Sequence, residues 1–239
     1  LEAKNISKKF PGVLALDSVD ISFEPGEIHA VIGENGAGKS TLIKCLTGVY
    51  TPESGEILIE GKNTIKNKEL YKKIAYVPQE IDLFKHMTVA ENLLIAKFRG
   101  EKRGLVPRGL NSYREEFQAT IEKIGNGLDK HLDTPIEFLS GGQRQALSLL
   151  MATLKRPELL LLDEHTAALD PKTSVALMEL TNEFVNRDRL TALMITHQME
   201  DALKYGNRLI VMKDGQIIQD LNKDEKAKMT IADYYGLFE

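Results

Sequence analysis

The sequence predicts an α/β fold in which a mostly parallel central sheet has antiparallel strands at its edge and is interrupted by a helical segment. Unbroken apolar runs within residues 159–162 and 190–196 are typical of strands buried on both faces, and a helical pattern over residues 172–187 separates them. Strands that alternate with helices favour a parallel sheet. An Asp-Gly pair within residues 209–219 predicts an antiparallel hairpin with a tight turn.

The first part of the chain is expected to contain short strands and one helix. Residues 16–23 alternate apolar and polar side chains and end at the turn formed by residues 24–26. A helix over residues 39–47 follows a glycine-rich loop, and Gly48 is placed to cap its C-terminus. The other strands expected in this part cover residues 27–32, 55–61 and 74–77.

A more helical and more charged character begins near residue 87 and lasts to about residue 156. Within it, residues 99–111 contain four glycine or proline residues and many charges, which predicts a solvated loop. We therefore expect one domain over residues 1–239. Its core is built from residues 1–86 and 157–239, and residues 87–156 form a helical subdomain.

Composition limits the functions that the chain can have. Its 239 residues include 31 basic and 35 acidic side chains, a formal net charge of −4, so we expect no nucleic-acid partner. The single cysteine, Cys45, excludes an intrachain disulfide, and its setting predicts a small buried side chain on a helix.

The sequence contains no apolar run of about 18 residues that could span a membrane as a helix. Its first residues lack the layout of a signal peptide, and the missing initiator methionine suggests a trimmed start. Because the chain ends soon after the predicted hairpin, we expect no separate C-terminal regulatory domain. The sequence thus predicts a soluble protein of the cytoplasm.

A glycine-rich motif of the pattern G-x-x-x-x-G-K-[ST] follows the strand expected at residues 27–32. A strand before the motif and a helix after it are the setting in which this pattern binds nucleotide phosphates. Glycines let successive N–H groups curl around a polyphosphate, and the helix N-terminus adds partial positive charge. Lys39 is expected to bridge the β- and γ-phosphates, and the Ser40 hydroxyl to bind Mg²⁺. The motif consists of Gly33, Glu34, Asn35, Gly36, Ala37, Gly38, Lys39, Ser40 and Thr41.

Two adjacent acids, Asp163 and Glu164, follow the apolar run at residues 159–162. In an open α/β sheet, ligands gather at the carboxyl ends of the strands, so both acids are expected near the phosphates. Because side chains alternate along a strand, the two acids are expected to have different tasks. Asp163 suits an outer-shell contact to Mg²⁺, and Glu164 is then the candidate general base that polarises the attacking water.

A second motif narrows the class of nucleotide-binding protein; it consists of Leu139, Ser140, Gly141, Gly142 and Gln143. Together with the phosphate-binding motif it resembles the signature of the ABC ATPase family, and the resemblance covers nearly the whole chain. It implies a phosphate-loop NTPase fold that binds ATP and Mg²⁺ and hydrolyses ATP to ADP and phosphate. In that family the signature binds the ATP held by the partner subunit. The residue pattern agrees, because Ser140 and the glycines precede a long helical stretch and form a second helix start suited to an anion.

The resemblance also assigns roles to four isolated residues. Gln79 matches the glutamine that touches Mg²⁺ and couples to the membrane partner. His197 matches the switch histidine that contacts the γ-phosphate, and Asp170 matches the aspartate of the D-loop. Phe10 is placed like the aromatic residue on which adenine stacks, with packing in the core as the alternative. The predicted catalytic residues are therefore Lys39, Gln79, Glu164 and His197, and the predicted metal ligands are Ser40, Gln79 and Asp163.

One residue departs from the family pattern. Proline commonly follows the general base, whereas here the residue is His165, which adds a titratable group. We expect His165 to be a tolerated variant without a catalytic role.

Two features favour an importer over an exporter. Residues 134–138 lack the glycine-rich, acidic lead-in typical of exporters, and the chain contains no transmembrane part. The resemblance therefore implies separate transmembrane permease subunits, a second ATPase subunit (another copy or a paralogue) and a location on the cytoplasmic face of the cell membrane. Residues 81–89 are the expected docking surface for the permease, although their apolar side chains could equally belong to the local core.

The class of cargo stays open between two importer types. Residues 10–16 are most similar to sugar-type importer ATPases, whereas residues 163–166 are less similar to them, which keeps an amino-acid-type importer open. Two functions outside transport are the alternatives. A DNA-repair or translation ATPase would need a long coiled-coil insertion or tandem domains with basic patches, and a regulatory nucleotide-binding module would lack an intact general base.

Overall fold

The chain forms two compact units in the computed structural model, which describes residues 1–81, 83–101, 109–122 and 127–236. The sheet unit comprises Leu1–Tyr76, Glu158–Glu164 and Phe184–Glu239. The helical unit comprises Val77–Pro157 and His165–Glu183, and it contains the segment predicted as a helical subdomain, residues 87–156.

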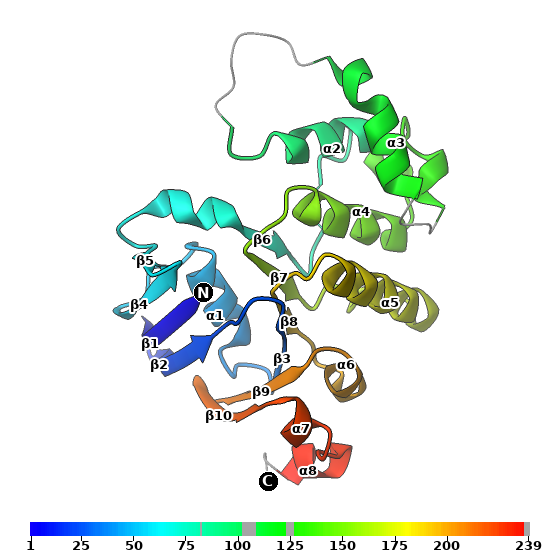
Figure 1. Cartoon of the computed structure of the whole chain (residues 1–239). Helices are drawn as coiled ribbons and strands as arrows, with labels where there is room; N and C mark the ends of the chain where they lie inside the picture. Colours follow the sequence, from blue (N-terminus) through cyan, green and yellow to red (C-terminus); the bar gives the residue numbers. More distant parts are fainter. Residues whose placement is uncertain (82, 102–108, 123–126, 237–239) are drawn as a thin grey trace. The chain divides into compact units, whose positions relative to one another are not determined.

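The strands of the described residues form two sheets (Figure 1). The larger sheet has the strand order β10-β9-β3-β8-β7-β6; β9, β3, β8 and β7 run parallel, and β10 pairs antiparallel at one edge. This arrangement confirms the predicted α/β fold. The smaller sheet, β2-β1-β4-β5, is antiparallel and stands apart instead of extending the edge of the parallel sheet. The strands are β1 Glu2–Phe10, β2 Val13–Ser22, β3 Ile28–Gly33, β4 Ser54–Ile59, β5 Lys62–Asn63, β6 Ile74–Val77, β7 Leu159–Asp163, β8 Ala192–Ile195, β9 Arg208–Lys213 and β10 Gln216–Leu221.

The central strands are short apolar runs because both of their faces are covered. All residues of β3, β7 and β8 are buried, as expected for parallel strands in the middle of a sheet. Strand β8 is shorter than the predicted strand at residues 190–196. Its first predicted residue instead ends the preceding helix: Arg189 adopts a left-handed φ of 47°, and the Leu190 N–H donates to the Val185 carbonyl.

Helix α1, Lys39–Leu46, packs between the two sheets, with β2 on one side and β3 and β7 on the other (Figure 1). Its apolar face joins the main hydrophobic core, in which Cys45 is fully buried, as predicted. Burial raises the pKa of the Cys45 thiol to about 11. Gly48 follows the helix at a φ of 75°, which confirms its predicted role as a C-terminal cap.

The helical unit is built from α2 Val89–Lys97, α3 Arg114–Glu122, α4 Gly141–Thr153 and the first part of α5 Pro171–Arg187. Helix α2 packs against both α3 and α4. Its start is fixed by a capping box in which Thr88 and Glu91 satisfy each other's backbone N–H groups. Of the loop predicted at residues 99–111, residues 102–108 lie outside the described residues, and its end enters the 3-10 helix Leu110–Tyr113.

The predicted hairpin near the end of the chain is confirmed. Strands β9 and β10 are joined by Asp214 and Gly215, at φ values of 49° and 79°.

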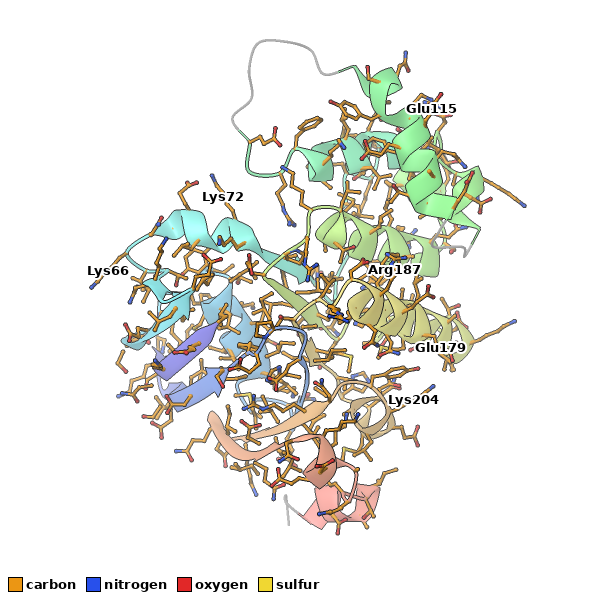
Figure 2. All side chains as sticks on the ribbon, in the orientation of Figure 1. Lys66, Lys72, Glu115, Glu179, Arg187 and Lys204 are labelled. Carbon is orange, nitrogen blue, oxygen red and sulfur yellow. The ribbon has the colours of Figure 1, made fainter. Side chains whose placement is uncertain are left out.

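Charged side chains such as Lys66, Lys72 and Glu115 point away from their units (Figure 2). No helix among the described residues is long and apolar enough to cross a membrane. The remaining helices are α6 Met199–Lys204, α7 Lys223–Lys226, α8 Ile231–Gly236 and the 3-10 helices Lys68–Lys73, Leu128–Lys130 and Ile136–Phe138.

Candidate nucleotide-binding site

The glycine-rich loop leaves the carboxyl end of β3 and enters α1 in the sheet unit. Gly38 is the N-cap of α1 at a φ of 99°, and a Cβ at this position would lie 2.5 Å from the Ala15 carbonyl oxygen. Only glycine fits this backbone without displacing β2. The N–H groups in the first turn of α1 lack helical acceptors, so the loop presents donors to an anion.

Lys39 is held inside this loop by the loop's own backbone. Its Nζ donates hydrogen bonds to the Gly33 carbonyl at 2.7 Å and to the Glu34 carbonyl at 2.9 Å, and the residue is only 6% exposed. Burial lowers the pKa of the ammonium group, and the negative charges of Glu164 and Asp163 oppose that shift. The loop's backbone therefore holds the Lys39 ammonium in place, and the charges of Glu164 and Asp163 act on that ammonium.

Asp163 is the last residue of β7, and it is buried. Its Oδ2 accepts a hydrogen bond of 3.0 Å from the hydroxyl of Tyr76, which lies on the neighbouring strand β6. Burial raises the pKa of the Asp163 carboxyl, the Tyr76 hydrogen bond lowers it, and the charge of Glu164 raises it. Tyr76 could not be identified from the sequence, because neither strand's own residue pattern shows that β6 lies beside β7.

Glu164 lies one residue beyond β7 in a left-handed conformation, at a φ of 46°. This backbone is uncommon for a residue with a side chain, and such strain gathers at functional sites. The different tasks of Asp163 and Glu164 were predicted from the alternation of side chains along a strand. Glu164 instead lies beyond the strand, and the left-handed turn sets the direction of its side chain. Its Oε2 lies 3.6 Å from Nδ1 of the exposed His197, and its N–H donates to the Ile195 carbonyl. The structure thus brings the predicted base and the predicted switch histidine together.

Phe10 is the last residue of β1 and is 36% exposed. Its ring meets that of Tyr50 edge to face, with 5.3 Å between the ring centroids, and Lys8 Nζ lies 5.5 Å from the centre of its ring. Tyr50 packs partly against the core and follows α1 closely. The partial exposure leaves surface for stacking, and the role of Phe10 in adenine binding stays a prediction.

The signature residues lie in the helical unit, at the start of α4. Ser140 is the N-cap: its Oγ accepts from the Gln143 N–H at 3.2 Å, and the Ser140 N–H donates to Oε1 of Gln143 at 3.0 Å. Leu139 is buried and anchors the motif. A Cβ on Gly142 would lie 2.4 Å from Cγ2 of Thr173, so this glycine allows the close approach of α5 to α4.

The other predicted site residues in the helical unit are Gln79 and Asp170, and both are exposed. Oδ1 of Asp170 accepts from the Thr173 N–H at 3.1 Å at the start of α5. The Thr173 side chain and then its N–H lower the pKa of the Asp170 carboxyl. Gln79 lines a groove of about 610 Å³ that lies within the helical unit.

This groove mixes charged and apolar side chains, and it includes part of the stretch predicted to dock a permease. Leu83 and Val89 of that stretch belong to the local core, whereas Phe84 and Lys85 are exposed. Phe138 is 71% exposed and adjoins the groove residue Glu137. The groove is lined by Gln79, Glu80, Ile81, Leu83, Lys85, Ile136, Glu137, Arg144, Gln145, His165, Ala168 and Leu169.

His165 is buried in the helical unit. Its Nε2 lies 3.1 Å from Oγ1 of Thr181, which donates its own proton to the Leu177 carbonyl; Nε2 therefore carries the proton that His165 donates to Thr181. Burial lowers the pKa of His165 to about 4 and keeps the ring neutral. The absence of a catalytic role for His165 stays a prediction.

The donors of the sheet unit fit a hard divalent cation. Asp163 and Ser40 offer oxygen atoms, which Mg²⁺ prefers over nitrogen or sulfur ligands. Among the described residues, Tyr76 is the only side chain that donates a hydrogen bond to the Asp163 carboxylate, and it does so at Oδ2.

Comparison with known proteins agrees with this geometry. A family model described as "ABC transporter" matches residues 16–167. The chain is 39% identical over 249 residues to the tyrosine transport ATP-binding protein of Clostridioides difficile (strain R20291), covering 100% of this chain and 98% of that protein. It is 37% identical over 222 residues to the arabinose import ATP-binding protein AraG of Yersinia pestis, covering 92% of this chain but 41% of that protein. The chain thus spans less than half the length of this sugar-import relative.

Solved structures give the same result for the fold. The ADP conformation of MJ1267, an ATP-binding cassette of an ABC transporter, aligns with a TM-score of 0.81 at 28% identity, covering 98% of each chain. A dimeric post-hydrolysis state of the ATP-binding cassette MJ0796, bound to ADP and Pi, aligns with a TM-score of 0.78 at 27% identity, covering 93% of this chain and 98% of that one.

The chain belongs to the ABC transporter family. The class predicted from the sequence, an ATP-binding protein of the importer type with a phosphate-loop α/β fold, is confirmed by these relatives and structures.

Proposed function

We propose that the chain hydrolyses ATP with Mg²⁺ and thereby powers an ABC importer for an amino acid or a chemically similar solute. The observation that carries the proposal is the grouping of Lys39, Asp163, Glu164 and His197 at the carboxyl ends of β3, β7 and β8. The amino-acid class is favoured because the tyrosine transport relative matches this chain over nearly its whole length. A sugar is the second candidate, from the identity to the arabinose import protein.

Each of these residues has a task that follows from its position. The Lys39 ammonium exchanges its carbonyl acceptors for phosphate oxygens, which are stronger acceptors because they are charged. Glu164 takes the proton of the attacking water, and His197 contacts the γ-phosphate from beside the Glu164 carboxylate. Ser40 and Asp163 of the sheet unit would hold Mg²⁺, which when bound neutralises charge on the phosphates; the role of Gln79 as a further ligand stays a prediction.

The proposal includes a head-to-tail pair of ATPase subunits. The phosphate-binding loop and the signature each offer the N-terminus of a helix of eight or more residues to an anion. A γ-phosphate that Lys39 holds on one side needs donors on its other side, and the signature of a second subunit supplies them. In such a two-fold pair every contact occurs twice.

Hydrolysis is tested with Lys39→Ala, which removes the cation from the loop. We expect phosphate release to fall to background, and nucleotide binding to weaken strongly, because charge-assisted bonds to the phosphates are lost. Lys72→Ala, at an exposed lysine paired with Glu69, is the matched control and should behave like the wild-type chain. Normal turnover by Lys39→Ala, in a preparation free of contaminating ATPase, would contradict the proposal.

Coupling to permease subunits at the cytoplasmic face of the membrane is proposed through the groove of the helical unit and its exposed rim residues, Phe84 and Phe138. Lys85→Glu reverses a charge on this surface. We expect the isolated subunit to keep its ATPase activity and the reconstituted importer to lose transport. Lys66→Glu, on the exposed surface of the sheet unit, is the control. Unchanged transport in Lys85→Glu would place the docking surface elsewhere.

A further inference from the structure

Tyr76 stands out among the residues that the proposed mechanism does not use. It ends in a hydroxyl 3.0 Å from Oδ2 of Asp163, and both residues belong to the sheet unit. The strands that carry them, β6 and β7, are neighbours in the sheet, so the backbone fixes the base of each side chain. An exposed tyrosine at the edge of a sheet needs no such partner, since water satisfies its hydroxyl equally well.

The bond matters because Asp163 has few other restraints. Among the described residues, no other side chain donates a hydrogen bond to its carboxylate, and the residue is buried, so water replaces Tyr76 poorly there. The charges of Lys39 and Lys44 act on the carboxylate without forming an ion pair with it in the described chain. A hydrogen bond to Oδ2 alone distinguishes the two carboxylate oxygens and restricts the rotation of the group.

We infer that Tyr76 is a positioning residue that fixes the Asp163 carboxylate in the orientation that receives Mg²⁺ or its bound water. The inference rests on the proposed function, in which Asp163 is a metal contact. Groups that orient a metal-binding side chain strengthen metal binding about 10- to 100-fold in known sites. Tyr76 therefore acts on metal affinity through Asp163 and does not itself touch the nucleotide.

The test compares Tyr76→Phe with the wild-type chain. The substitution keeps the ring and removes only the hydroxyl, so the fold is preserved. Calorimetric titration with a non-hydrolysable ATP analogue, in Mg²⁺ and in EDTA, gives the gain in nucleotide affinity due to the metal. We expect that gain to fall about 10-fold in Tyr76→Phe, with the affinity in EDTA unchanged. Binding of Mn²⁺ in place of Mg²⁺, followed by electron paramagnetic resonance, should weaken to the same extent.

Two further variants make the result specific. Tyr71→Phe is the matched control, because it removes a hydroxyl of the same unit that is hydrogen-bonded to Thr64 instead of Asp163. In an Asp163→Asn background, Tyr76→Phe should cause no further loss, since the two residues act as one unit. A metal-dependent gain in Tyr76→Phe equal to that in Tyr71→Phe would overturn the inference alone. A wild-type chain without any metal-dependent gain would overturn both the inference and the proposed role of Mg²⁺.

Discussion

Replacement of Glu164 by Gln tests the assignment of the general base. The substitution keeps the shape of the side chain, so the turn at φ 46° and the neighbouring His197 are retained. A positioned general base typically contributes about 10²–10⁴-fold in rate. That range corresponds to about 3–5 kcal/mol of activation free energy, so turnover should fall to about 1% of the wild-type rate or less. Binding of ATP should not weaken, because the lost negative charge would have faced the phosphates.

The assay for Glu164→Gln combines single-turnover phosphate release with measurement of retained ATP and light scattering. We expect slow release, intact ATP in the protein fraction and a dimer that appears only with ATP. Glu60→Gln, at an exposed glutamate paired with Lys73, makes the same chemical change away from the site and should match the wild-type chain. Turnover by Glu164→Gln within about three-fold of the Glu60→Gln rate would refute the assignment, since general-base catalysis is worth far more. A monomer at saturating ATP, with ATP binding confirmed, would refute the pairing of isolated subunits.

Three further outcomes are expected. Adding Ser140→Arg to the Glu164→Gln chain places bulk and positive charge in the proposed subunit interface, so light scattering should show a monomer; a persisting dimer would argue against the signature as the contact. Gly142→Ala should lower the free energy of unfolding by about 1–3 kcal/mol in urea titrations, because its Cβ would lie 2.4 Å from Cγ2 of Thr173, and Thr173→Ser should restore part of the loss. His165 has a folded-state pKa of about 4, below its ordinary 6.5, so its contribution is complete above pH 6.5 and is lost as the pH falls toward 4. His165→Gln should therefore reduce the loss of stability between pH 7.5 and 5 by about 2 kcal/mol; an unchanged loss would contradict the burial argument.

The elements that the sequence predicted best are those whose structure depends on local chemistry. Strand β7 and the Asp214-Gly215 turn were predicted because burial on both faces and a positive φ each require particular residues. The limits of β8 were wrong because the left-handed turn at Arg189 involves a residue type that rarely indicates one.

Long-range pairing was the part that could not be predicted. Strand β1 pairs with β4, about fifty residues away, and this pairing makes a separate antiparallel sheet that no single stretch of sequence indicates. The contact of Tyr76 with Asp163 has the same origin, since it depends on which strand lies beside β7. The site residues carried by contiguous motifs were accessible from the sequence because their spacing is itself the signal.

In the capping box, the Ser140 hydroxyl has two roles: it caps α4 and it can donate a hydrogen bond to phosphate. Its Oγ accepts the Gln143 N–H and so starts α4, which leaves the hydroxyl proton free for donation. The hydroxyl can therefore donate a hydrogen bond to an anion while it caps the helix. Threonine would keep both capacities, whereas alanine would lose the cap, at a cost of about 1 kcal/mol, together with the outward donor. Substitutions at this position therefore change helix stability and phosphate recognition together. Threonine, which keeps the cap and the donor, is the reference against which the combined loss in alanine is measured.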